Sequence, residues 1–147
     1  MFASTRIVLV LTAVIAANLS KETVTKERLA EKDFPIRVLV SPAAFHREMV
    51  SLRFEFDHGN AGDSEWAAVE LIVKEPTSNK KIAVVPVEFR RDGDERKTIA
   101  KIDVDVEFAL SCDVVISRWH GSSEHEFHIP LKLFADEMKD EQKAAKK

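Results

Sequence analysis

The chain has 147 residues, a length that suits one domain and is short for two. Apolar residues make up 45% of the sequence and charged residues 32%, as is typical of soluble globular proteins. The formal net charge is −3 and the pI is near 6.0, so the basic balance of a nucleic-acid-binding domain is absent. The sequence contains no Tyr, which speaks against an antibody-like recognition surface.

Residues 1–17 have the pattern of a secretory signal peptide. Arg6 provides a positive charge, an uncharged apolar run begins at Ile7, and the small residues Ala16 and Ala17 end it. The run is shorter than the roughly 18 apolar residues that a membrane span needs, so we expect no such span in the mature chain. We expect cleavage near Ala17 and export to the periplasm or the medium. A buried N-terminal element and an uncleaved membrane anchor are the alternatives.

Two charged segments flank the central part of the chain. Residues 18–35 are rich in Lys, Glu and Thr, which predicts a solvated spacer or a short, poorly anchored helix. Residues 135–147 favour a helix but offer it no apolar face, which predicts a charged, frayed tail. The folded domain is therefore expected over residues 36–134.

Within residues 36–134 apolar and polar side chains alternate with a period of two. The clearest run sets an apolar series against an acidic one: Ile102, Val104, Val106, Phe108 and Leu110 against Asp103, Asp105 and Glu107. This pattern predicts antiparallel strands with one face on a core and the other in water. We expect Val106 and Phe108 inside the core and Asp105 on the wet face.

Counting such runs predicts about seven strands in an all-β domain. They are expected over residues 36–40, 50–57, 66–74, 82–90, 97–109, 112–119 and 124–134. Seven short amphipathic strands favour an antiparallel β-sandwich of immunoglobulin-like or fibronectin-like type, with a small closed β-barrel as the alternative. Trp66 opens the third strand, but no cysteine pair flanks it, so the disulfide-and-tryptophan pattern of antibody domains is absent.

Turn signals suggest how some of these strands pair. The dipeptide Asp92-Gly93 favours a two-residue type I′ turn, which places Arg91 opposite Asp94 and Glu88 opposite Lys97. Pro86 lacks a backbone donor, so its strand should lie at a sheet edge or carry a bulge.

Three histidines lie close together in the sequence, at His120, His125 and His128. The dipeptide Gly121-Ser122 favours a type II′ turn between two strands, with Ile116 opposite Phe127 and Arg118 opposite His125. His120 and His125 then share one face and His128 lies on the other. A metal ion would engage at most two of them, fewer than the three or four protein ligands of zinc sites.

His120 and His125 are the candidate ligands of a zinc or copper ion, with His46 or His58 as donors from elsewhere. A polar hairpin tip without metal is the simpler interpretation. We therefore assign no resident cofactor.

Other signs of chemistry are few. The sequence has no G-x-S-x-G, C-x-x-C or Gly-rich phosphate-binding motif. Cys112 shares its parity with Val114 and Ile116, which predicts an inward, inert thiol. Asp103 and Asp105 could form a carboxylate pair for glycoside chemistry, but the wet face of a strand explains them more simply. We assign no catalytic residue and leave open whether the protein is an enzyme, with a non-enzymatic role favoured.

Three functions stay open, in this order. The first is an exported non-enzymatic module that binds a protein or cell-envelope partner through sheet edges and loops, with no nucleic-acid partner. The second is an exported zinc-binding or copper-binding protein that uses the hairpin 120–128. The third is a hydrolase without a recognisable motif.

The signal-peptide interpretation predicts the mass of the mature protein. Mass spectrometry of the chain from the cells that make it should show a new N-terminus near Ala17. An intact Met1 end on cytosolic protein would contradict export.

Overall fold

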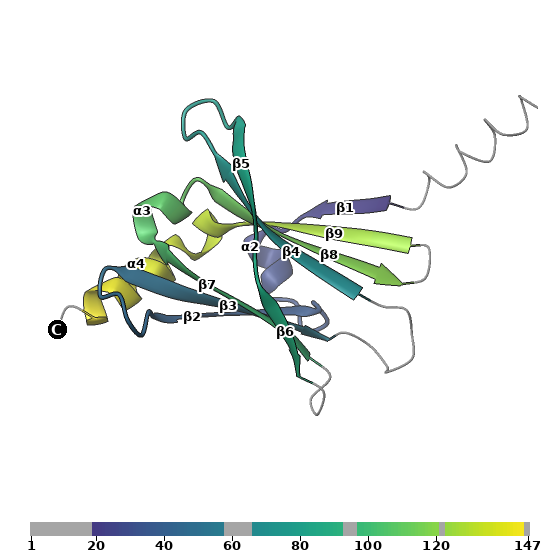
Figure 1. Cartoon of the computed structure of the whole chain (residues 1–147), viewed down its shortest axis with the longest axis horizontal. Coiled ribbons are helices and arrows are strands. Elements are labelled where there is room, and N and C mark those ends of the chain that lie inside the picture. The colour runs from purple at the N-terminus through teal and green to yellow at the C-terminus, as the bar shows by residue number, and fades with distance from the viewer. Residues whose placement is uncertain (1–18, 58–65, 93–96, 121–122, 146–147) are drawn as a thin grey trace, which may run out of the picture.

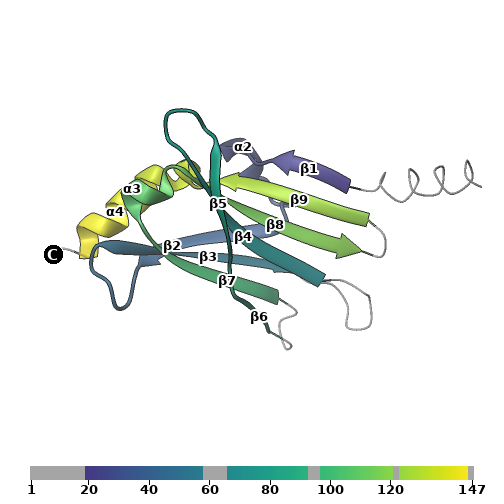
Figure 2. The same cartoon turned by 45° about the horizontal axis from the view of Figure 1, so that its top comes forward.

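The structure, a computed structural model, describes residues 19–57, 66–92, 97–120 and 123–145 (Figure 1). Over these ranges the chain is mostly β, with two open sheets in a sandwich-like arrangement and a helix at the C-terminal end (Figures 1 and 2). Because neither sheet closes on itself, the alternative expectation of a closed barrel is wrong. No helix among the described residues is long and apolar enough to cross a bilayer.

Five strands form one sheet and four form the other. In spatial order the first sheet contains β1 (Leu19–Thr23), β9 (Ser123–Pro130), β8 (Cys112–His120), β4 (Trp66–Lys74) and β5 (Lys81–Pro86). The second contains β2 (Ile36–Pro42), β3 (Met49–Asp57), β7 (Lys97–Asp105) and β6 (Phe89–Asp92). The helical segments are α2 (Lys26–Leu29), α3 (Val106–Ala109), the 3-10 helix η1 (Leu131–Phe134) and α4 (Ala135–Ala145). Strand β1 pairs with β9 in parallel, and the other pairs are antiparallel.

The core lies between the inner faces of the two sheets. Alternate residues of β3, including Leu52 and Phe54, are fully buried, and Val114 and Ile116 of β8 are equally buried in the other sheet. Burying each such side chain stabilises the fold by about 1.5–3 kcal/mol. The period-two alternation therefore predicted the inward residues of these central strands correctly.

The run expected as one strand over 97–109 is a strand followed by a turn of helix. Strand β7 ends at Asp105, whose Oδ1 accepts hydrogen bonds from the backbone N–H groups of Glu107 at 3.0 Å and Phe108 at 3.2 Å. This cap starts α3, which buries Val106 but leaves Phe108 45% exposed. The expectation of a core position for Phe108 is wrong, because the capping side chain of Asp105 ends the strand and starts a helical turn.

The run expected as one strand over 82–90 divides between the two sheets. The Val87 N–H donates to the Val69 carbonyl at 2.8 Å, so the chain stays beside β4 up to that residue. Only the four residues of β6 then reach β7, with Asp92 opposite Lys97. The expected register of Asp92-Gly93 is therefore wrong, and residues 93–96 lie outside the described residues. The edge position expected from Pro86 is confirmed, because β5 ends the five-stranded sheet.

Residues 18–35, expected as a spacer, contain β1 and α2. Val24 is 2% exposed, and its N–H donates to the carbonyl of His128 at 2.8 Å. The ring of Phe34 meets that of Phe127 edge-on, with 5.7 Å between the centroids. A few apolar anchors thus hold a mostly polar segment against β9, which composition alone did not reveal.

Residues 135–147, expected as a frayed tail, form α4 over most of their length. Met138 is fully buried, and the helix packs against β2 at the end of the sandwich (Figure 2). Lys26 Nζ lies 2.7 Å from Glu137 Oε1 and joins α2 to α4. The hydrogen bond from Lys26 holds the pKa of the Glu137 carboxyl below its ordinary value. The buried side chain of Met138 thus anchors a helix that has no continuous apolar face.

The helical turn at α3 generates a paired prediction. Val106→Asp should unfold the domain, because a carboxylate would enter the core without a partner. Phe108→Asp should change the free energy of unfolding by about 1 kcal/mol or less, because its side chain is half exposed. Urea unfolding of both variants measures the difference, and equal losses would contradict the turn.

Candidate functional site

The β8–β9 hairpin carries the histidines singled out in the sequence, and its predicted register is confirmed. Ile116 lies opposite Phe127 and Arg118 opposite His125. His125 is therefore on the same side of the sheet as the buried Phe127, and His128 is on the other side. Residues 121–122, where the turn is expected, lie outside the described residues.

Each described histidine of the hairpin has its own local environment. The ring of His125 stacks on Phe127 with 4.1 Å between the centroids. Its Nε2 is 3.9 Å from Glu22 Oε1, beyond hydrogen-bond distance, while Glu22 Oε2 accepts from Arg28 Nε at 2.9 Å. His128 Nε2 lies 3.0 Å from Glu126 Oε2 on the outer face. The two rings thus lie near different carboxylates, and of the two only the ring of His128 is within hydrogen-bond distance of one.

The described part of the chain contains no group of three or more His, Cys, Asp or Glu residues that could hold a metal ion. The side chain of His120 and the whole of His58 lie outside the described residues, and His46 is exposed between β2 and β3. The assignment of a zinc or copper ion to His120 and His125 therefore stays a prediction.

Cys112 points into the core, as its parity predicted. It is 1% exposed, and its Sγ donates to the carbonyl of Phe108 at 3.3 Å. Burial raises the pKa of the thiol, and the nearby charge of Asp113 adds to the effect. Because the thiolate is the nucleophilic form, this cysteine is unsuited to covalent catalysis.

The two acidic residues considered for glycoside chemistry have separate surroundings. Asp103 is exposed on β7, and Asp105 is engaged as the cap of α3. The carboxyl group of Asp105 accepts two backbone N–H groups, which hold it in place at the start of α3. Of the two residues, Asp105 therefore has a structural role, as the cap of α3.

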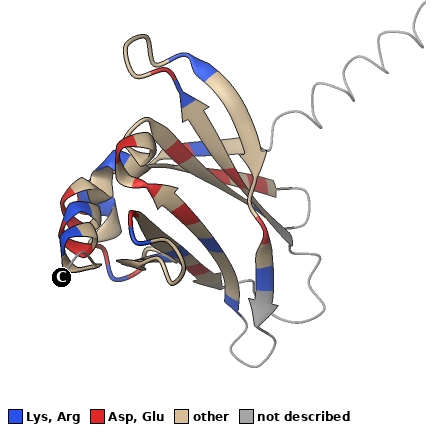
Figure 3. Cartoon of the chain, turned by 60° about the vertical axis from the view of Figure 1, so that its left-hand side comes forward, with Lys and Arg blue, Asp and Glu red and all other residues tan. Residues whose placement is uncertain are grey.

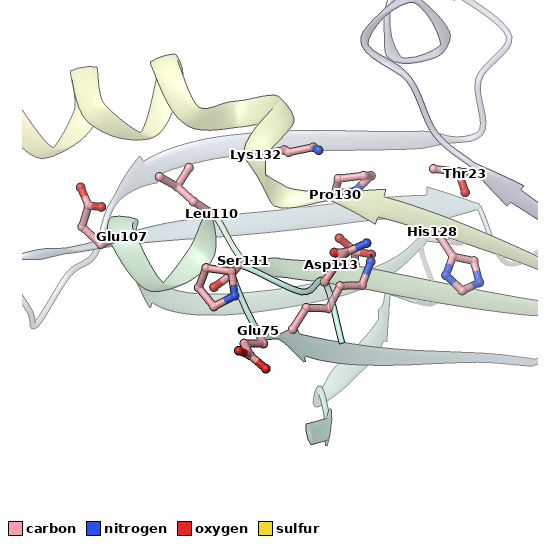
Figure 4. A pocket seen from close by; sticks show the side chains of 12 residues that line it. Thr23, Glu75, Glu107, Leu110, Ser111, Asp113, His128, Pro130 and Lys132 are labelled. Carbon is pink, nitrogen blue, oxygen red and sulfur yellow. Dashed lines mark hydrogen bonds and ion pairs between the residues drawn. The ribbon is translucent and has the colours of Figure 1, made fainter. Parts of the chain in front are cut away.

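A polar cavity of about 740 Å³ opens at the base of the β4–β5 hairpin (Figure 4). Lys74 and Asp113 form an ion pair across β4 and β8 within it. Figure 4 shows His128 at one end of the cavity and Glu107 at the other. The two opposite charges at its centre neutralise each other, which is the behaviour of a structural pair.

A different feature stands out along strand β5. All six of its residues are exposed, and three of them are large and apolar: Ile82 at 64%, Val84 at 38% and Val85 at 46%. Among the described strands β5 has a neighbour, β4, on one side only, and its hairpin projects away from the sandwich (Figure 1). An exposed apolar edge strand is a template for pairing with another chain.

The pairing of β5 with β4 determines which residues of β5 direct their backbone N–H and C=O groups toward β4 and which direct them outward. The hydrogen bond from Val87 to Val69 and the pairing of Val85 with Leu71 direct the odd residues toward β4. Val84 therefore directs its N–H and C=O outward, and Pro86 directs its C=O outward. The missing donor of Pro86 costs the sheet no hydrogen bond, because it would have faced solvent.

One irregularity interrupts this edge. The register shifts so that Lys74 pairs with Lys81, while Val73 pairs with Ala83. Ile82 is thereby left between paired neighbours, as in a β-bulge. Bulges limit how far an edge can extend by adding strands, so the pairing surface centres on Val84.

The sequence predicted from Pro86 that this strand lies at a sheet edge, but it did not single out Ile82, Val84 and Val85 as exposed, because they have the same pattern as the apolar residues of a core strand.

The chain matches no family model, and no curated protein is similar to it at a significant level. Among solved structures it is similar to IrmA from Escherichia coli, at 15% sequence identity and a TM-score of 0.36. That similarity covers 67% of this chain and 85% of IrmA. At this level it carries no information about function.

The hairpin register predicts how a divalent metal would behave. Zinc should bind weakly and raise the melting temperature little at micromolar metal, because two histidines at most share a face. His120→Ala or His125→Ala should abolish that binding, and His128→Ala should leave it unchanged. Calorimetric titration measures it, and a tight complex that needs all three histidines would overturn the assignment.

Proposed function

We propose that this chain is an exported, non-enzymatic β-sandwich module that binds an extended segment of a partner protein along β5. The observation that carries the proposal is the exposed apolar edge formed by Ile82, Val84 and Val85. A partner strand would bury these side chains and satisfy the outward N–H and C=O of Val84. This is the β-augmentation mode of recognition, in which the backbone supplies affinity and alternate side chains supply specificity.

The other three sheet edges support this choice by contrast. Strand β1 is short and has one apolar residue, Leu19. Strand β2 is packed against α4, and β6 has four residues of which Arg90 and Arg91 are basic. Short, charged or covered edges are the usual protections against unwanted pairing. Strand β5 has a bulge and Pro86 but keeps its apolar surface exposed.

The proposal includes an immunoglobulin-type arrangement of the strands. The order β2-β3-β7-β6 corresponds to the A-B-E-D sheet, and β9-β8-β4-β5 corresponds to G-F-C with an added C′ strand. Strand β1 is an addition beside β9. The cysteine pair of antibody domains is missing, and the side chain of Trp66 lies outside the described residues. The arrangement favours a binding module by analogy only.

Export is the second part of the proposal. It is supported by the signal-peptide pattern of residues 1–17, which lie outside the described residues. The burial of Cys112 also suits an oxidising compartment, where an exposed lone thiol would react. The partner would then belong to the cell envelope or the medium.

Site-specific photo-crosslinking in the cells that make the protein tests the proposal. A photoreactive residue in place of Val84 should give a discrete adduct, and mass spectrometry should map it to an extended segment of a protein. The same label at Lys101, an exposed residue of the central strand β7, should give no such adduct.

A second variant tests the physical cause. Ile82→Asp places a carboxylate on the apolar edge and should weaken the adduct from Val84 at least several-fold. No adduct from Val84, or identical adducts from Val84 and Lys101, would contradict binding at β5.

A further inference from the structure

We infer that the segment taken up by β5 is β5 of a second copy of this chain, so that two five-stranded sheets join into one sheet across a two-fold axis. The inference rests on the proposed function, since it uses the same edge, and it identifies the partner. Three properties of the edge lead to it: its hydrogen-bond phase, its apolar faces and its charges.

The hydrogen-bond phase allows a symmetric pair centred on Val84. Antiparallel β5 strands related by a two-fold axis through this residue place Val84 opposite Val84 of the partner subunit. Because Val84 directs both backbone groups outward, the two copies would exchange two N–H to O=C hydrogen bonds there. The same register places Pro86 near Ile82 of the partner subunit, where the missing donor leaves one acceptor available.

The apolar faces match in this register. Val84 shares a face with Ile72, which lies opposite it on β4 and is partly buried. The two-fold axis would double this into a continuous apolar stripe on the outer face of the joined sheet. On the inner face, Val85 would lie opposite Ala83 of the partner subunit. Apolar cross-strand pairs of this kind stabilise sheets.

The charges at the two ends of β5 are complementary to each other. Lys80 and Lys81 begin the strand and Glu88 follows it, and all three are exposed. Figure 3 shows basic colour at the start of β5 and acidic colour on the segment that joins β5 to β6. Because the pairing is antiparallel, the lysines of each copy would lie beside Glu88 of the partner subunit. The dimer would therefore contain this contact twice.

The β-bulge at Ile82 does not disturb this charge complementarity. A one-residue shift at the bulge exchanges Lys80 for Lys81 opposite the acidic residue, and both are lysine. Within the described residues, the side chains of Lys80, Lys81 and Glu88 have no ion-pair partner of their own. The β4–β5 hairpin, which carries this edge, projects away from the rest of the sandwich (Figures 1 and 3).

Sedimentation velocity of the purified chain with exchanged charges tests the inference. The native chain should form a concentration-dependent dimer. Glu88→Lys should abolish it, and so should Lys80→Glu combined with Lys81→Glu, because each places like charges opposite each other. An equimolar mixture of the two variants should recover the dimer, because both contacts are then again between opposite charges.

Two controls make the result specific to β5. Glu107→Lys makes the same charge change on exposed α3 and should leave the dimer intact. Val84→Pro removes the outward N–H and should give a monomer that is still folded by circular dichroism. A dimer that survives all of these changes would overturn the inference.

The outcomes separate this inference from the proposed function. A native chain that stays monomeric while Val84 crosslinks to another protein would overturn self-pairing and leave edge binding intact. A monomeric chain with no adduct from Val84 would overturn both.

Discussion

The hydrogen bond from the Val87 N–H to the Val69 carbonyl, 2.8 Å long, governs much of the arrangement around β5. It keeps the chain beside β4 through Val87, so the crossing to the other sheet occurs only in the next residues. Strand β6 then begins at Phe89 and pairs with β7. The same bond fixes which residues of β5 face β4 and which face outward. The proposed pairing surface consists of the backbone groups that face outward.

An edge strand next to a filled core has a specific physical problem. Val85 lies on the inner face, opposite the buried Leu71, yet it is 46% exposed, since among the described strands β5 pairs with β4 alone. Val84, on the outer face, is 38% exposed. An added strand would reduce this exposure without moving the core. Pro86 and the bulge at Ile82 limit the addition to a short central segment, which favours a defined pair over open-ended growth.

Sequence reasoning succeeded where local and tertiary signals agreed. The register of β8 with β9 followed from a turn dipeptide and from matching apolar parity, and the structure has the same pairs. It failed at Asp92-Gly93, where the turn dipeptide predicted Arg91 opposite Asp94, whereas β6 and β7 pair Asp92 with Lys97. It also failed at Asp105, whose carboxylate stops β7 by capping α3.

The remaining differences share one cause. Val24 and Met138 are apolar residues in charged segments, and each is buried against the sandwich, so composition underestimated β1 and α4. At β5 the sequence predicted the edge position from Pro86 but not the exposure of Ile82, Val84 and Val85. Exposure depends on which strands are neighbours, and period-two alternation does not contain that information.

Amide hydrogen exchange at Val84 and Val85 tests the central claim, which is that the outward edge of β5 is a pairing surface. In dilute protein, Val85 should be protected by its pairing with β4 and Val84 should exchange rapidly. As the concentration of the chain rises, the protection of Val84 should increase while that of Val85 stays constant. Rapid exchange of Val84 at every concentration, or protection of Val84 with exposure of Val85, would contradict the account.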